Sequence, residues 1–197
     1  MTTQPVRPQV PDALLERAVR GDAAAIGQLL KQLAPGMIRA SRQLLGSSHA
    51  DVDDVVQQSL IGLVQALPSF RGECSLAHFA SRIVTRTALA ARRRTALRGD
   101  RLDDAIEPDG FGVEASQDAA VEAERRRHAV RALMERLPEE QAETLALRVV
   151  LGFSLEEVAE ATGVPLNTVR SRVRLAKTSL KKRIEADPRL LAALEVE

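Results

Sequence analysis

The sequence predicts an all-α protein with two small helical domains joined by an acidic, flexible linker. Nearly half of the 197 residues are apolar, mainly Ala, Leu and Val, whereas aromatic residues make up only 2% of the chain. Long runs of Ala, Leu, Arg and Glu favour helices, because these residues have high helix propensities. An acidic stretch separates two such helix-rich halves, which indicates two domains.

The acidic stretch lies between residues 98 and 124. Every charged residue from Asp100 to Glu124 is acidic except Arg101, and a proline and two glycines interrupt any helix there. Repulsion between like charges extends such a segment. Two interpretations stay open: a solvated tether between the domains, or an acidic plug.

The same changes in composition divide the whole chain. Three prolines near the N-terminus predict a flexible lead-in. The predicted segments are an N-terminal tail (residues 1–11), a first helical domain (12–97), the linker (98–124), a second helical domain (125–186) and a C-terminal tail (187–197). In the first domain, Pro35-Gly36 either kinks the predicted helix at residues 23–45 or separates it into two.

The composition also excludes several classes of protein. Cys74 is the single cysteine, so the chain can form neither an internal disulfide nor a cysteine zinc site, and its three histidines lack metal-ligand spacing. No apolar run approaches the roughly 20 residues that span a bilayer, and the N-terminus lacks the apolar core of a signal peptide. We therefore expect a cytoplasmic protein without a catalytic centre, metal, cofactor, small-molecule substrate or membrane insertion.

Residues 154–183 have the layout of a helix-turn-helix. Ser154 and Glu157 form a predicted capping box at the start of the first helix. Gly163 supplies the turn, since only glycine adopts positive φ without a steric cost, and Pro165 suits the start of the second helix. The second helix of such a motif enters the major groove of DNA.

The second helix of this motif has one apolar face and one cationic face. No acidic residue lies between Glu160 and Glu185, whereas an ordinary surface helix mixes both signs. A polar face of a single sign beside this turn favours nucleic-acid binding over a merely solvated surface. The predicted apolar face comprises Leu166, Val169, Val173, Ala176, Leu180 and Ile184.

A second helix with a single sign of charge lies in the first domain. Ser75 is its predicted N-cap, and no acidic residue occurs between Glu73 and Asp100. Each half of the chain therefore carries one cationic helix. The cations of this helix are Arg82, Arg86, Arg92, Arg93 and Arg94.

Both halves resemble one family of proteins. Residues 51–84 (DVDDVVQQSLIGLVQALPSFRGECSLAHFASRIV) resemble the domain of bacterial RNA polymerase sigma factors that binds the polymerase and melts the promoter. Residues 137–182 (LPEEQAETLALRVVLGFSLEEVAEATGVPLNTVRSRVRLAKTSLKK) resemble the C-terminal domain of the same family. With no further domain in between, the resemblance is to the extracytoplasmic function (ECF) subfamily. It implies that residues 12–97 form sigma domain 2 and residues 125–186 form sigma domain 4.

The resemblance implies three partners: core RNA polymerase, promoter DNA and an anti-sigma factor. The polymerase would be bound through its clamp coiled coil and its flap, and Asp54, Gln57 and Gln58 would contact the coiled coil. Family members often carry glutamate where Gln58 stands. The implied function is promoter-specific initiation of transcription through −35 and −10 elements.

For the −10 element, the resemblance implies that Ala66 and Phe70 help to form a pocket for a flipped base. The family commonly has tryptophan where Phe79 stands and asparagine where Arg86 stands. Arg86 could bind phosphate or stack on a base, but the hydrogen bonds of an asparagine to a base edge are lost. The predicted contacts on the −10 side are Ala66, Phe70, His78, Arg82, Arg86, Arg93 and Arg94.

For the −35 element, the resemblance assigns recognition to the helix-turn-helix. Arginine suits guanine, asparagine suits adenine and leucine suits the thymine methyl group. The candidates for base contacts are Asn167, Ser171, Arg174 and Leu175, and those for phosphate contacts are Thr168, Arg170, Arg172 and Lys177.

Two alternative functions are weighed against this interpretation. A stand-alone helix-turn-helix regulator normally dimerises on a two-fold operator, and it would leave the resemblance of the first domain unexplained. An adaptor that binds only protein would leave both cationic helices merely solvated.

Overall fold

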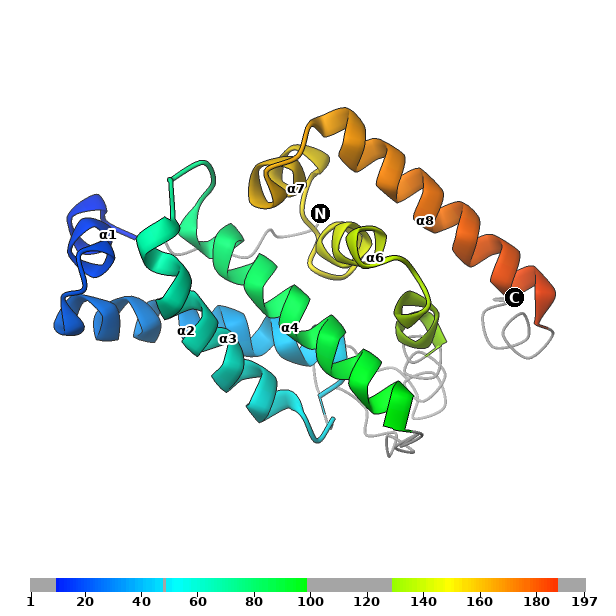
Figure 1. The fold of residues 1–197 in the computed structure, drawn as a ribbon, viewed down its shortest axis with the longest axis horizontal. Helices are drawn as coiled ribbons and strands as arrows, with labels where there is room; N and C mark the ends of the chain where they lie inside the picture. The colour runs from blue at the N-terminus through cyan, green and yellow to red at the C-terminus, as the bar shows by residue number, and fades with distance from the viewer. Residues whose placement is uncertain (1–9, 48, 99–128, 188–197) are drawn as a thin grey trace, which may run out of the picture.

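The computed structural model describes residues 10–47, 49–98 and 129–187 (Figure 1). Within these ranges every regular element is helical, which confirms the all-α prediction. The tail at residues 1–9, most of the predicted linker and residues 188–197 lie outside the described part. The first domain contains α1 (Asp12–Val19), α2 (Ala23–Leu45), α3 (Val52–Ala66), the short 3₁₀ helix η1 (Leu67–Ser69) and α4 (Leu76–Arg98). The second contains a helical stretch at residues 129–135, α6 (Glu139–Leu145), the π-helical turn η2 (Ala146–Val150), α7 (Leu155–Thr162) and α8 (Leu166–Ala186).

The first domain is built on α2, α3 and α4, which pack against one another pairwise. Leu29 and Leu33 of α2, Leu63 of α3 and Val84 of α4 are buried between them. Burying each such side chain contributes about 1.5–3 kcal/mol. α1 packs on α2 at the edge of the molecule (Figure 1).

Helix α2 runs through Pro35 without a break. The sequence left a kink and two separate helices open, and the structure contains one continuous helix. Proline removes one backbone hydrogen bond and costs about 3 kcal/mol in a helix interior. Leu33 and Met37, on either side of Pro35, are both buried, and their burial offsets that cost.

Asp22 caps the start of α2. Its Oδ1 accepts hydrogen bonds from the backbone N–H groups of Ala24 (2.9 Å) and Ala25 (3.1 Å). Its Oδ2 accepts two hydrogen bonds from Arg17, at 2.8 and 2.6 Å. The Arg17 hydrogen bond, followed by the backbone hydrogen bonds, lowers the pKa of Asp22 below its usual value of 3.8.

The second domain has a small core of its own. Gly152 has a φ of +73°, which turns the chain between η2 and α7, and Arg148 Nη1 closes this turn by donating to the Phe153 carbonyl (2.8 Å). α8 runs along the outer edge of the domain and packs on α6 and α7 (Figure 1). The core consists of Leu147, Phe153, Val158, Ala161 and Val169.

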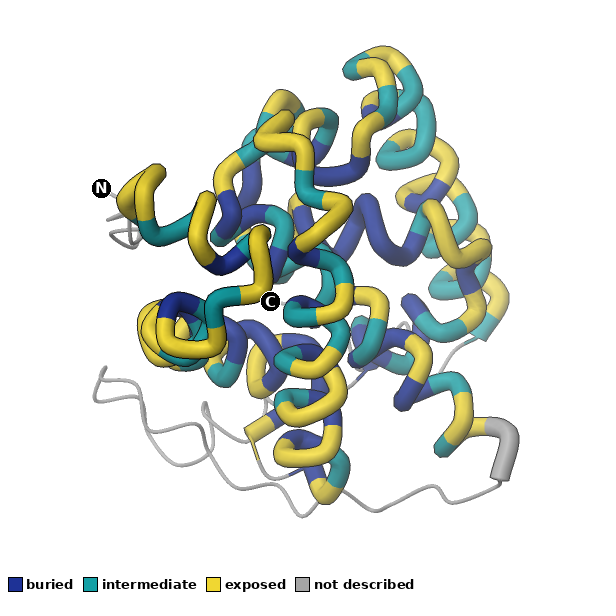
Figure 2. Tube along the Cα trace, turned by 60° about the vertical axis from the view of Figure 1, so that its left-hand side comes forward, coloured by how far each residue is buried: buried dark blue, intermediate teal, exposed yellow. Residues whose placement is uncertain are grey.

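The two domains pack against each other. α4 contacts α2 and α3 of its own domain, and α6, η2 and α7 of the second domain (Figure 1). Met134, Leu137, Ala142 and Leu145 of the second domain join the core of the first. Figure 2 shows buried stretches of the chain gathered in the interior, so the apolar core continues across the domain boundary.

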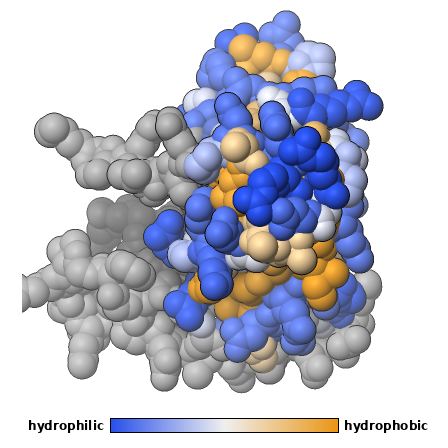
Figure 3. Space-filling model, turned by 90° about the vertical axis from the view of Figure 1, so that its left-hand side faces the viewer, coloured by the Kyte–Doolittle hydropathy of each residue, from blue (hydrophilic) through white to orange (hydrophobic). Residues whose placement is uncertain are grey.

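One face of the described part mixes apolar and hydrophilic areas. Seen from the side that lies on the left in Figure 1, apolar areas are broken up by hydrophilic side chains (Figure 3). Among the described residues, the exposed large apolar side chains are Ile61, Val149 and Leu175. No helix in the same residues has the length and apolar character needed to cross a membrane.

We predict that Asp22→Ala destabilises the protein more at neutral pH than in acid. A lowered pKa in the folded state stabilises the fold above the unfolded value of 3.8, and this stabilisation is lost as the pH falls through the folded pKa. The difference in melting temperature between wild type and Asp22→Ala, followed by circular dichroism, should therefore narrow as the pH falls below about 4. A difference that stays constant would show that the charge of Asp22 contributes nothing.

Candidate nucleic-acid interface

The predicted caps fix the turn of the helix-turn-helix. Ser154 Oγ accepts a hydrogen bond from the Glu157 N–H (3.0 Å), and Glu157 Oε2 accepts one from the Ser154 N–H (2.8 Å). Gly163 ends α7 in the left-handed conformation, with a φ of +69°. α8 begins after Pro165. The predicted capping box and glycine turn are therefore both confirmed.

Helix α8 has the two faces that its periodicity predicted. Val169 and Ala176 are fully buried, and the other four residues of the predicted apolar face are half-buried. The apolar face thus anchors the helix, and the polar face points outwards. Of the predicted −35 contacts, Asn167, Arg170, Arg174, Leu175 and Lys177 are exposed, and Thr168, Ser171 and Arg172 are half-buried.

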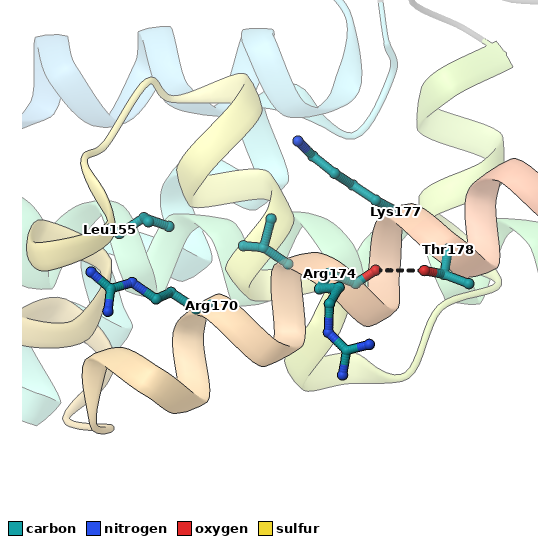
Figure 4. Close-up of a pocket in the computed structure, with 6 residues that line it drawn as sticks. Leu155, Arg170, Arg174, Lys177 and Thr178 are labelled. Carbon is teal, nitrogen blue, oxygen red and sulfur yellow. Dashed lines mark hydrogen bonds between the residues drawn. The ribbon is translucent and has the colours of Figure 1, made fainter.

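Three cations of α8, Arg170, Arg174 and Lys177, line a shallow groove (Figure 4). Arg170 Nη1 donates to Asn167 Oδ1 (3.3 Å), and the Arg174 carbonyl accepts a hydrogen bond from Thr178 Oγ1 (3.0 Å). Within the described residues, the ion pairs of α8 are made by other cations. The groove therefore presents positive charge that suits a DNA phosphate.

Arg172 is one of those other cations. Its guanidinium pairs with Glu140 in the first turn of α6, and its side chain is 17% exposed. This contact ties α8 to α6. The sequence predicted a phosphate contact for Arg172. In this conformation its guanidinium is paired with the Glu140 carboxylate instead.

The cationic face of α4 lies against the second domain. Ser75 caps the helix as predicted, because its Oγ accepts a hydrogen bond from the His78 N–H (3.2 Å). Three of the predicted −10 contacts, Arg82, Arg86 and Arg93, pair with carboxylates of α6. Arg94, at the far end of the helix, is exposed. Three of the four predicted −10 arginines therefore lie together, and all three contact protein.

His78 also lies between the domains. It is 5% exposed, its ring packs on Phe153 with centroids 4.6 Å apart, and its Nε2 lies 3.6 Å from Glu157 Oε1. The sequence predicted a DNA contact for His78. Such a contact requires a conformation in which α7 has moved away from α4.

The two residues predicted to form a base pocket are partly accessible. Ala66, at the end of α3, and Phe70, after η1, are both half-buried. The Phe70 ring packs on the Phe79 ring at 5.0 Å and 54°. Phe79 also packs against the first domain's core, so the ring that contacts Phe70 is anchored in that core.

A cleft beside this pocket contains residues that the sequence analysis missed. Arg71, Cys74 and Glu160 line it together with Phe70 and Phe79. Burial, and then the nearby Glu160 carboxylate, raise the pKa of the Cys74 thiol above 9.0. Glu160 belongs to α7, so only the packing of the two domains brings it to the cleft, and no local pattern could have indicated it.

The predicted polymerase contacts form an exposed face of α3. Asp54, Gln57 and Gln58 are all exposed. Ile61, one turn further on, is 50% exposed and shares this face, because residues at i, i+3, i+4 and i+7 align on a helix. The sequence analysis missed Ile61, although its spacing from Asp54 could have indicated it.

The described residues contain no group of three or more His, Cys, Asp or Glu side chains that could hold a metal ion. The exposed residues of the predicted site offer guanidinium and ammonium groups, an amide and an apolar side chain.

Comparisons with known proteins agree with this arrangement. The family model for Sigma-70 region 2 matches residues 29–98, and the model for Sigma-70, region 4 matches residues 127–180. The ECF RNA polymerase sigma factor SigD of Mycobacterium tuberculosis is 33% identical over 184 residues, which cover 89% of this chain and 84% of that protein. The ECF RNA polymerase sigma-E factor of Escherichia coli is 30% identical over 181 residues, which cover 87% and 93%.

The fold has a counterpart among solved structures. The structure of CnrH in complex with the cytosolic domain of CnrY matches with a TM-score of 0.53 and 22% identity, over 89% of this chain and 97% of that chain. This likeness supports the fold. From the sequence matches, the chain belongs to the ECF RNA polymerase sigma factors, and its two helical domains are regions 2 and 4 of that family.

We predict that Ser154→Ala destabilises the second domain by about 1 kcal/mol, because it removes one half of the capping box. Urea unfolding of the full chain, with amide exchange of α7 as the local probe, measures the loss. Ser154→Asp retains an oxygen acceptor and should stay close to wild type. An equal loss in both variants would mean that the cap is not the cause.

Proposed function

We propose that this chain binds core RNA polymerase and directs it to promoters by recognising −35 and −10 elements. The observation that carries the proposal is the ordered pair of sigma regions, each of which contributes one cationic helix, α4 or α8. A helix-turn-helix alone occurs in many classes of regulator. Region 2 followed by region 4 is much more specific, and a stand-alone regulator would leave region 2 without a role.

In the second domain, α8 would lie in the major groove of the −35 duplex. The exposed Arg174 and Asn167 carry the hydrogen-bonding groups that suit guanine and adenine. Leu175 is 44% exposed and suits a thymine methyl group. Arg170 and Lys177 would bind phosphates, which position the helix without specifying the sequence.

In the first domain, the end of α3 and the start of α4 would hold the melted −10 strand. Extruding a base costs a few kcal/mol, and stacking it on an aromatic ring such as that of Phe70 returns about 1–3 kcal/mol. Arg86 offers a phosphate contact or a stacking surface in place of the amide that the family commonly has there. This difference supports a −10 sequence distinct from that of most relatives.

The polymerase would contact both domains. The face of α3 formed by Asp54, Gln57 and Gln58 would bind the clamp coiled coil, with the exposed Ile61 as an apolar contact at the end of this face. Protein interfaces usually combine apolar and polar contacts in this way. The second domain would bind the flap.

Regulation by an anti-sigma factor is part of the proposal, because ECF factors are usually held inactive by such a partner. The proposed role takes place in the cytoplasm. It requires no catalytic group, metal or cofactor from this chain, since the polymerase performs the chemistry.

Reconstitution tests the proposed function directly. The full chain is mixed with core RNA polymerase and a promoter library, and initiation is measured by sequencing the transcripts. Initiation from a subset with shared −35 and −10 sequences supports the proposal. Failure to initiate, together with tight binding to duplex DNA by the chain alone, would favour the stand-alone regulator instead.

For the −35 contact, we predict that Arg174→Ala weakens binding of the holoenzyme to its preferred −35 duplex by about 1–3 kcal/mol and relaxes preference at one base pair. Lys177→Ala is the matched control, because it should weaken all sequences about equally and reduce the salt dependence of binding. Competition binding against single-base variants measures both effects. A uniform loss for Arg174→Ala would contradict its assignment as a base contact.

A further inference from the structure

The contact between α4 and the second domain uses the arginines that −10 DNA would need. Arg82, Arg86 and Arg93 lie on one face of α4, and each pairs with a carboxylate of α6. We propose that the free chain is closed on itself and that closure excludes −10 DNA, because the α6 carboxylates occupy these arginines. The exclusion rests on the proposed function, whereas the closure is a property of the chain alone.

The central contact of the closed form joins Arg82 to Glu143. Arg82 Nε lies 2.9 Å from Glu143 Oε1, and the Glu143 side chain is only 8% exposed. Taking this carboxylate out of water is costly, and the Arg82 guanidinium beside it offsets part of that cost. Removing either charge therefore favours separation of α4 from α6, since separation returns the remaining group to water.

Glu139 adds weaker contacts at the surface. Its Oε1 lies 3.6 Å from Arg86 Nη2, and its Oε2 lies 3.6 Å from Arg93 Nη1. The Glu139 side chain is 56% exposed, and ion pairs at such sites contribute little and are screened by salt. These two pairs make closure sensitive to ionic strength.

Closure also uses contacts that DNA would not make. Arg92 is 7% exposed, its Nη2 lies 2.6 Å from Glu135 Oε1, and its Nη1 donates to the Leu45 carbonyl (3.2 Å). Met134 and Leu137, on the same side of the second domain, are buried in the shared core. The interface is therefore a packed surface with apolar contacts, and the ion pairs form only part of it.

The proposed −35 helix, α8, lies outside the contact between α4 and the second domain. Arg170, Arg174 and Lys177 line the outer groove of α8 (Figure 4), and α8 contacts α6 and α7. The closed chain therefore leaves its −35 face accessible, whereas three arginines of its −10 face are paired with carboxylates of α6. The observed affinity for a −10 strand is then the affinity of the open form reduced by the fraction of open molecules.

Cys74 provides a native reporter of opening. It lines the cleft between the first domain and α7, where burial and then Glu160 raise the pKa of its thiol. Moving α7 away removes the Glu160 contribution and opens one wall of the cleft, so the thiolate fraction at neutral pH and the access of a reagent both rise. Cys74 is the single cysteine of the chain, so the alkylation rate with iodoacetamide, a neutral reagent, reports on this site alone.

Glu143→Gln is the test variant, because it removes the buried charge and keeps the shape of the side chain. Glu156→Gln is the matched control: it makes the same change in net charge at an exposed position of α7. We expect Glu143→Gln to raise the Cys74 alkylation rate at least severalfold and to increase the radius of gyration in small-angle scattering. Glu139→Gln, at an exposed site, should raise the alkylation rate and the radius of gyration by smaller amounts. Added NaCl should raise both quantities in the wild type.

The DNA arm of the experiment uses single-stranded oligonucleotides of random sequence as a probe for α4, and random duplex as a probe for α8. Both are titrated into the full chain at low salt, without polymerase. Glu143→Gln should bind the single strand at least severalfold more tightly than Glu156→Gln. The two variants should bind the duplex equally, because α8 is unchanged.

The outcomes separate the two parts of the proposal. Wild-type alkylation rates and radii of gyration in folded Glu143→Gln and Glu139→Gln would overturn the closure, whatever the protein does with polymerase. Opening without a gain in single-strand affinity over Glu156→Gln would overturn the exclusion. Circular dichroism confirms folding. If Glu143→Gln unfolds, the radius of gyration of the wild type at low salt decides, because a value for two separated domains would overturn the closure. Failure of the transcription assay alone would count against the proposed function and leave the closure standing.

Discussion

The charge of Glu143 constrains the whole arrangement. A carboxylate that is 8% exposed needs a cation beside it, and Arg82 supplies that cation from the other domain. The buried carboxylate of the second domain is thus paired with a cation on α4 of the first domain. The apolar contacts of Met134 and Leu137 with the first domain's core are compatible with this pairing because they lie along the same surface. One arginine therefore belongs both to a predicted DNA surface and to the interior of the closed protein.

The two cationic helices are held by interactions of different range. α8 is positioned by the local capping box of Ser154 and Glu157 and by the turn at Gly163. These contacts lie within the second domain, so the shape of the −35 surface does not depend on the position of the first. α4 has one face on α2 and α3 and another on α6 and α7, so the environment of its arginines depends on whether the domains touch.

Sequence reasoning predicted the local features and missed the long-range ones. The capping box and the Gly163 turn involve residues a few positions apart, so spacing alone was enough to predict them. Arg82 and Glu143 are 61 residues apart, and Glu143 looks like any other acidic residue of a surface helix. The continuity of α2 through Pro35 was equally out of reach, because it depends on tertiary burial of the residues around it.

The division of α8 into a buried and an exposed face bears on how such proteins diverge. Val169 and Ala176 are fully buried and Leu175 is 44% exposed, so neighbouring residues of one helix serve separate purposes. Asn167, Arg174 and Leu175 are exposed, so substituting them leaves the packing of α8 intact. Under the proposed role of α8, copies of the gene could therefore acquire new promoter preferences through a few surface changes that do not disturb the core.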